Sequence, residues 1–99
     1  MVPDNYKFEY TWWDDFAIAD AFGLKAVKDT YKRAFSCWKD NRVAMQELTL
    51  VLNWRCWKHY NEGRTELSKL YSDLYDECYS KCLDHFKGEE LTAYWSFLD

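Results

Sequence analysis

The sequence predicts an all-α fold, an antiparallel helical bundle of four main helices with a short fifth helix at the C-terminus. Apolar residues recur with a period of about 3.6 residues, which is the spacing along one face of an α-helix. The 99 residues include one proline and three glycines, which leaves little room for long irregular loops. Each glycine follows a segment of helical period, where a left-handed residue commonly ends a helix. Short connections between helices favour antiparallel neighbours.

The first two helices are expected over residues 12–22 and 24–39. Thr11 with Asp14 resembles a capping pair, and the acidic pair at 14–15 suits a helix N-terminus. Gly23 separates the two helices. The second helix has one apolar face that we expect to enter the core, made of Leu24, Val27, Tyr31, Ala34, Phe35 and Trp38.

The remaining helices are expected over residues 42–61, 65–87 and 89–98. Asp40 and Asn41 interrupt the periodic pattern and offer N-cap side chains, while Gly63 and Gly88 follow the third and fourth helices. The fourth helix presents a core-facing arc of Leu67, Leu70, Tyr71, Leu74, Tyr75, Cys78, Cys82 and His85.

The chain fits a single helical domain over residues 1–99, in which residues 1–10 form an N-terminal arm. Tyr6, Phe8 and Tyr10 are expected to pack this arm on the helices. The N-terminus has no basic start followed by an apolar run, and no long uncharged apolar stretch follows. We therefore expect a cytoplasmic protein with reduced cysteines and no contact with a membrane.

The aromatic residues are unusually numerous, with six Trp, eight Tyr and six Phe. On the third helix, Leu50, Trp54 and Trp57 form a second apolar face opposite the one that carries His59. Either the first or the fifth helix covers this face, or the face binds a partner or a second copy of the chain. The candidate partner-binding residues are Trp13, Trp54, Trp57 and Trp95.

Two charged faces are further candidates. The basic face of the second helix consists of Lys25, Lys28, Lys32, Arg33 and Lys39, which suits a phosphate backbone or an acidic protein. The acidic face of the fourth helix consists of Asp73, Asp76, Glu77 and Asp84, which would suit a basic partner. Either face could equally serve only to keep the protein soluble.

Residues 18–24 followed by the second helix resemble a helix-turn-helix motif, with the second helix as the recognition helix. Asp29 and Lys32 depart from that pattern, because they occupy places where the motif usually buries apolar residues.

A zinc site is conceivable from the spacing of Cys37, Cys78, Cys82 and His85. The alternative is that the cysteines are buried as small apolar side chains, since the short Cys-x-x-Cys knuckle is missing. No phosphate loop, catalytic triad order or metalloprotease motif is present, so we expect neither catalysis nor a cofactor.

Four segments carry a resemblance to a group of known sequences. They are residues 10–23, residues 29–35 with Trp38 and Lys39, residues 47–53 with Trp57, His59 and Tyr60, and residues 87–91. Together they resemble small uncharacterised proteins of phages and integrative mobile elements of gut Firmicutes. The resemblance implies an accessory factor, a class that includes inhibitors of host defence such as anti-CRISPR proteins, and it assigns no catalytic residue.

The expected function is therefore that of a non-enzymatic binding protein from a bacterial mobile element. Its expected partner is a host protein or a defence nucleoprotein such as a CRISPR effector, and homodimerisation is a further possibility. The alternative is a small nucleic-acid-binding regulator that uses the basic face of the second helix.

Overall fold

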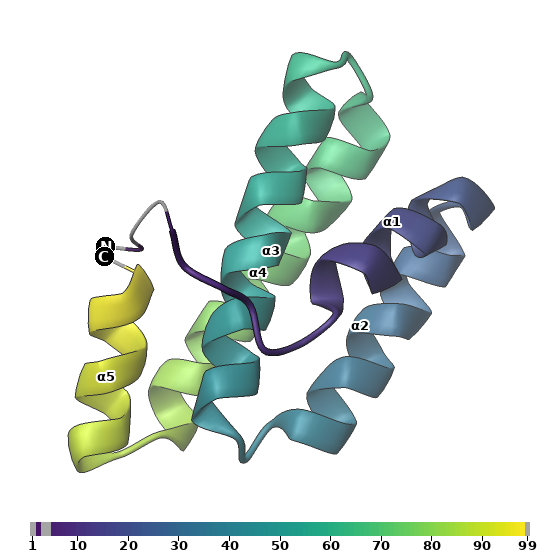
Figure 1. The fold of residues 1–99 in the computed structure, drawn as a ribbon. Coiled ribbons are helices and arrows are strands. Elements are labelled where there is room, and N and C mark those ends of the chain that lie inside the picture. The colour runs from purple at the N-terminus through teal and green to yellow at the C-terminus, as the bar shows by residue number, and fades with distance from the viewer. Residues whose placement is uncertain (1, 3–4, 99) are drawn as a thin grey trace.

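The computed structural model describes residue 2 and residues 5–98, and the described residues form helices without any strand (Figure 1). The helices are α1 (Trp12–Phe22), α2 (Leu24–Trp38), α3 (Arg42–Asn61), α4 (Thr65–His85) and α5 (Gly88–Leu98). The all-α class is thereby confirmed. The finer prediction of a regular antiparallel four-helix bundle stays a prediction.

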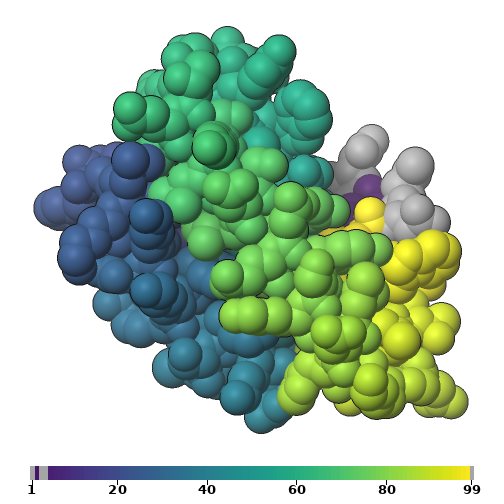
Figure 2. Space-filling view, turned by 180° about the vertical axis from the view of Figure 1, so that it is seen from behind, coloured from purple at the N-terminus to yellow at the C-terminus, as the bar shows by residue number. Residues whose placement is uncertain are grey.

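The helices α3 and α4 form the centre of the molecule. α4 runs back along α3, the pair α1 and α2 packs on one side, and α5 packs on the other (Figure 1). Seen from behind, the surface of α4 lies between that of α2 and that of α5 (Figure 2). Residues 5–11 run across α3 before α1 begins (Figure 1).

Two of the helix boundaries lie at the residues that predicted them, Gly23 and Asn41. Gly23 adopts a φ of 108° between α1 and α2, which is a conformation that other residues rarely adopt. The side chain of Asn41 caps α3 by accepting a hydrogen bond of 3.0 Å from the amide of Ala44, as expected. The expected capping pair of Thr11 and Asp14 is wrong, because the Thr11 hydroxyl donates to Asp15 instead.

The C-terminal end of α4 also differs from the prediction. The helix ends at His85 because Phe86 adopts an extended conformation, and this buries the Phe86 ring. His85 is consequently exposed and pairs with Asp40 over 2.6 Å, which corrects its expected place in the core. Gly88 begins α5.

Trp38 is a second correction to the expected core. Its side chain is 39% exposed, although its ring contacts the rings of Tyr10 and Trp12. It lies in the last turn of α2, where its ring neighbours among the described residues come from the N-terminal arm and the start of α1. Leu24, at the first position of α2, is similarly exposed, so the buried face of α2 is shorter than its apolar pattern.

The first half of α3 is the most deeply buried part of the chain. Every residue from 44 to 52 is buried, so this half has no face toward solvent. Its interpretation as a central helix is confirmed here. The polar residues in this stretch, Gln46, Glu47 and Thr49, must therefore find partners inside the protein.

Glu47 finds its partners in the N-terminal arm. Its carboxylate accepts hydrogen bonds from the amides of Glu9, at 2.9 Å, and Tyr10, at 3.0 Å. The Tyr6 hydroxyl donates to the same carboxylate. Burial, together with this hydrogen bond and the Glu47 charge, raises the pKa of Tyr6 to about 12. The packing of the arm on the helices is thereby confirmed, and its anchor is a buried charge.

We expect the substitution Glu47→Gln to lower the free energy of unfolding by about 1–3 kcal/mol. An amide has one acceptor oxygen, and its NH₂ group would face the donor groups of the arm. Urea unfolding followed by tryptophan fluorescence measures the change.

The control is Asp73→Asn, because Asp73 is exposed on α4 and its side chain makes no hydrogen bond or ion pair with the other described residues. That change should alter the free energy of unfolding by less than about 0.5 kcal/mol. Equal effects of the two substitutions would show that Glu47 does not anchor the arm.

Candidate functional site

The outer side of α3 emerges from the core in its second half. Leu50 is still buried, but the exposed fraction rises to 42% at Trp54, 56% at Trp57 and 63% at Tyr60. These residues follow one another at spacings of three or four, so they lie on one side of the helix. The face of α3 opposite His59 is therefore buried at Leu50 and exposed from Trp54 onward.

Neighbouring rings hold this open face in place. The ring of Trp54 contacts Phe8 at 5.8 Å and Trp13 at 6.0 Å between centroids, in edge-to-face geometry. Trp57 contacts Tyr60 in the same way at 5.7 Å. We call Trp13, Trp54, Trp57 and Tyr60 the aromatic surface. Of the two helices expected to cover this face, α1 supplies Trp13, and the arm, which was not expected there, supplies Phe8.

Trp95 does not belong to the aromatic surface. It is exposed on α5, and among the described residues it makes no ring contact. The structure thus brings Trp13, Trp54 and Trp57 together and leaves Trp95 apart. Tyr60 was missed, although its spacing of three residues from Trp57 was a signal for it.

A buried polar cluster lies behind Trp13. Asp20 of α1 accepts hydrogen bonds from both Nε, at 3.2 Å, and Nη2 of Arg55 on α3. It also lies 2.7 Å from Nε2 of His59 and accepts the hydroxyl of Tyr71 from α4. One carboxylate therefore ties three helices together.

The electrostatics of this cluster keep Arg55 charged. Burial alone would lower the pKa of the Arg55 guanidinium, but the hydrogen bond and charge of Asp20 outweigh it and raise this pKa. Burial, followed by the hydrogen bond to Asp20, raises the pKa of Tyr71. The guanidinium lies 5.0 Å above the ring of Trp13. This cation–π contact fixes Trp13 at the edge of the aromatic surface.

A hollow of about 260 Å³ adjoins the cluster. It is lined by Asp20, Ala21, Arg55, Lys58, His59, Arg64 and Leu67. The apolar pattern of α3 places His59 in the core but does not identify its partners. The spacing of four residues between Arg55 and His59 was the available signal.

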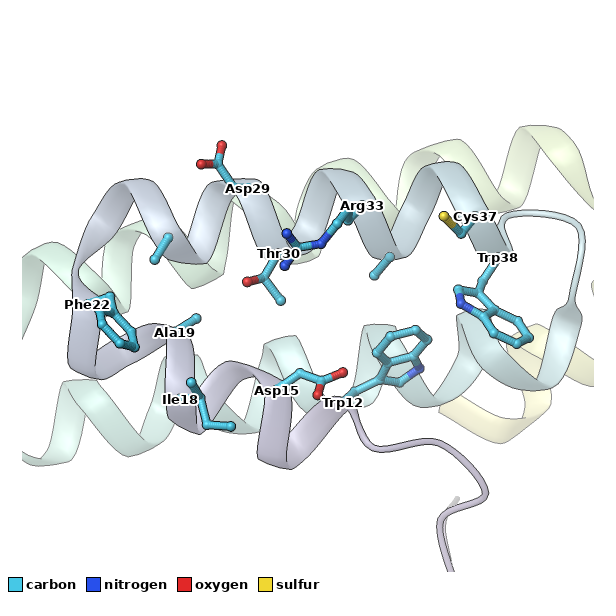
Figure 3. Close-up of a pocket in the computed structure, with 12 residues that line it drawn as sticks. Trp12, Asp15, Ile18, Ala19, Phe22, Asp29, Thr30, Arg33, Cys37 and Trp38 are labelled. Atoms are coloured by element: carbon cyan, nitrogen blue, oxygen red, sulfur yellow. The ribbon is translucent and has the colours of Figure 1, made fainter.

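The basic face of α2 is exposed throughout. Lys25 pairs with Asp29 over 2.7 Å. Only Gly23 separates α1 from α2, and the two helices lie side by side (Figure 3). A helix-turn-helix instead has a turn of 3–4 residues and a crossing angle of about 90–120°. The arrangement of α1 and α2 therefore differs from that motif.

The acidic face of α4 is exposed at all of its expected residues, Asp73, Asp76, Glu77 and Asp84. Glu77 pairs with Lys81 over 3.4 Å. The face therefore carries more negative than positive charge toward solvent, as the sequence indicates.

The residues of the conceivable zinc site do not meet. Cys37 is exposed on α2, Cys78 and Cys82 are buried, and His85 pairs with Asp40. Within residue 2 and residues 5–98, no three His, Cys, Asp or Glu side chains are grouped to hold a metal ion. A hydrogen bond with Cys82 and burial raise the pKa of Cys78, so its sulfur stays a neutral thiol.

A groove runs between α1 and α2 on their outer side (Figure 3). Its volume is about 570 Å³, and its lining includes Phe22 toward one end and Trp38 toward the other. Phe22 and Ile18 are 80% and 61% exposed. The groove was not predicted from the sequence, because Phe22 was expected only as the last residue of a helix.

Comparisons with protein-family models, with curated proteins and with solved structures find no match for this chain. Among the described helices, none combines the length and the apolar content needed to cross a bilayer.

We expect Asp20→Asn to lower the free energy of unfolding by about 3 kcal/mol or more, because it leaves the buried Arg55 guanidinium without a counter-charge. Chemical denaturation measures the loss. The control is Asp73→Asn on the exposed side of α4, which should change little. A loss no greater than that of the control would contradict the bridging role of Asp20.

Proposed function

We propose that this chain is a non-enzymatic binding protein that engages a protein partner through the aromatic surface. The observation that carries the proposal is the exposure of Trp54, Trp57 and Tyr60 in a continuous row on α3. Tryptophan and tyrosine are the residue types that most often dominate binding energy at interfaces.

The fixed position of these rings supports the proposal. Trp13 is held by Arg55 and by the edge of Trp54, and Trp54 is held in addition by Phe8. A side chain that is already ordered loses less conformational entropy when it binds. The aromatic surface can therefore contribute more of its burial energy to affinity than a row of mobile rings.

The resemblance to proteins of mobile elements extends the proposal to the kind of partner. In that form, the partner is a host-defence nucleoprotein such as a CRISPR effector, and the chain is its inhibitor. Defence nucleoproteins carry basic channels for nucleic acid, and the exposed acids of α4 supply the opposite charge. The aromatic surface would then provide affinity, and the acidic face would guide association.

The alternative function, nucleic-acid binding through the basic face of α2, makes a distinct prediction. Binding to a short DNA duplex should weaken steeply as salt rises, because each phosphate contact releases counterions. Fluorescence anisotropy at low and high salt decides this alternative, and no binding at low salt would remove it.

We expect Trp57→Ser to weaken partner binding by about tenfold or more, the effect of losing an interfacial hot spot. The free energy of unfolding should change by less than about 0.5 kcal/mol, because Trp57 is largely exposed. The probe is a photo-crosslinking amino acid placed at Tyr60 in bacterial cells, and the yield of the crosslinked adduct reports binding.

The matched control is Trp95→Ser, which removes an exposed tryptophan of α5 away from the aromatic surface. It should leave the yield of the adduct unchanged. If Trp95→Ser lowered the yield while Trp57→Ser did not, the binding surface would lie on α5 and the proposal would fail. A separate variant that reverses the charge of Asp73, Asp76, Glu77 and Asp84 tests whether the acidic face contributes to the yield of the adduct.

A further inference from the structure

We infer that the groove between α1 and α2 binds the same groove of a second copy of this chain, which makes the protein a two-fold symmetric dimer. This inference does not rest on the proposed function. Ile18 lies about 140° around α1 from Trp13, so the groove and the aromatic surface use different sides of that helix.

The apolar content of the groove is the first argument. Phe22 and Ile18 are 80% and 61% exposed, and Trp38 adds a third large side chain. The groove is bounded by two helices that lie side by side, and no other described element lies over them (Figure 3). Two such pairs stacked face to face form a four-helix arrangement, which buries the open apolar side of each pair.

The charges in the groove are the second argument. Asp15 lines it from α1 and Arg33 lines it from α2 (Figure 3). Among the described residues, these two side chains do not form an ion pair, either with each other or with another group. Asp29 also lines the groove but is already paired with Lys25 over 2.7 Å, so the groove offers one charge of each sign that has no ion-pair partner, which suits a self-complementary surface.

The register of the two helices places these charges opposite each other in the dimer. Asp15 lies eight residues before Gly23 and Arg33 lies ten residues after it, so their levels along the hairpin differ by about 3 Å. A two-fold axis parallel to the helices sets α1 of each copy over α2 of the other at the same level. Asp15 of one copy then faces Arg33 of the other, twice per dimer.

The size of the face sets the expected affinity. The 15 residues of α2 span about 22 Å, and two helices side by side are about 20 Å wide. This is a small interface, so we expect a dissociation constant of about 1–100 µM. Sedimentation equilibrium from about 1 to 500 µM covers that range and should show masses rising from 12.0 kDa toward twice this value.

The decisive experiment uses the charge-reversed variants Asp15→Arg and Arg33→Asp. Each variant alone places like charges opposite each other and should raise the dissociation constant of the dimer about tenfold or more. In an equimolar mixture of the two, both cross-copy pairs have opposite charges, so a heterodimer should form at least as tightly as the unmodified dimer. Phe22→Asp should raise the dissociation constant of the dimer about tenfold, whether or not the charges of Asp15 and Arg33 are changed.

Trp57→Ser is the control, because it removes a ring of the aromatic surface and should leave the dimer unchanged. Circular dichroism checks that each variant is folded, which we expect because Phe22, Arg33 and Trp57 are exposed and Asp15 is half-buried. A monomer at every concentration would overturn the inference and leave the groove to a different occupant. A dimer that responds to Trp57→Ser but not to Phe22→Asp or to the charge reversals would overturn it as well.

Discussion

The structure depends on the burial of α3. Because the residues from 44 to 52 are buried, each polar side chain there requires a partner inside the protein. Gln46 accepts a hydrogen bond from Arg42 of α3 itself, whereas Glu47 and Thr49 reach the outer elements. Glu47 takes the amides of the N-terminal arm, and the hydroxyl of Thr49 shares a hydrogen bond of 2.7 Å with Tyr94 of α5. Further along α3, Arg55 donates hydrogen bonds to Asp20 of α1. The polar groups of one central helix thus determine where the outer elements attach.

The candidate surfaces follow from the same constraint. The arm and α1 are anchored near the middle of α3, so they cover its outer side only in part and leave Trp54, Trp57 and Tyr60 exposed. The ion pair that attaches α1 also orients Arg55 beneath Trp13. The side of α1 away from α3 then faces outward with α2, and the apolar groove lies there. One arrangement of helices accounts for both surfaces.

The sequence predicts the helices well, because glycines and the Asn41 cap are local signals that tertiary contacts did not override. It fails where the outcome depends on distant residues. His85 and Trp38 fit the core pattern of their helices, but they lie in terminal turns that no other element fully covers. The pairing of Asp20 with Arg55 joins residues 35 positions apart, and no local pattern reports it. The aromatic surface could be predicted from the two-faced pattern of α3, whereas the groove required the packing of α1 against α2.

Amide hydrogen exchange at Glu9 and Tyr10 tests most directly whether buried polar groups of α3 hold the outer elements. These amides lie outside any helix, and their acceptor is the Glu47 carboxylate. We expect them to exchange about as slowly as amides in the middle of α3, and to lose this protection in the Glu47→Gln variant while α4 keeps its own. Exchange at the rate of an unstructured peptide in the unmodified protein would contradict the account.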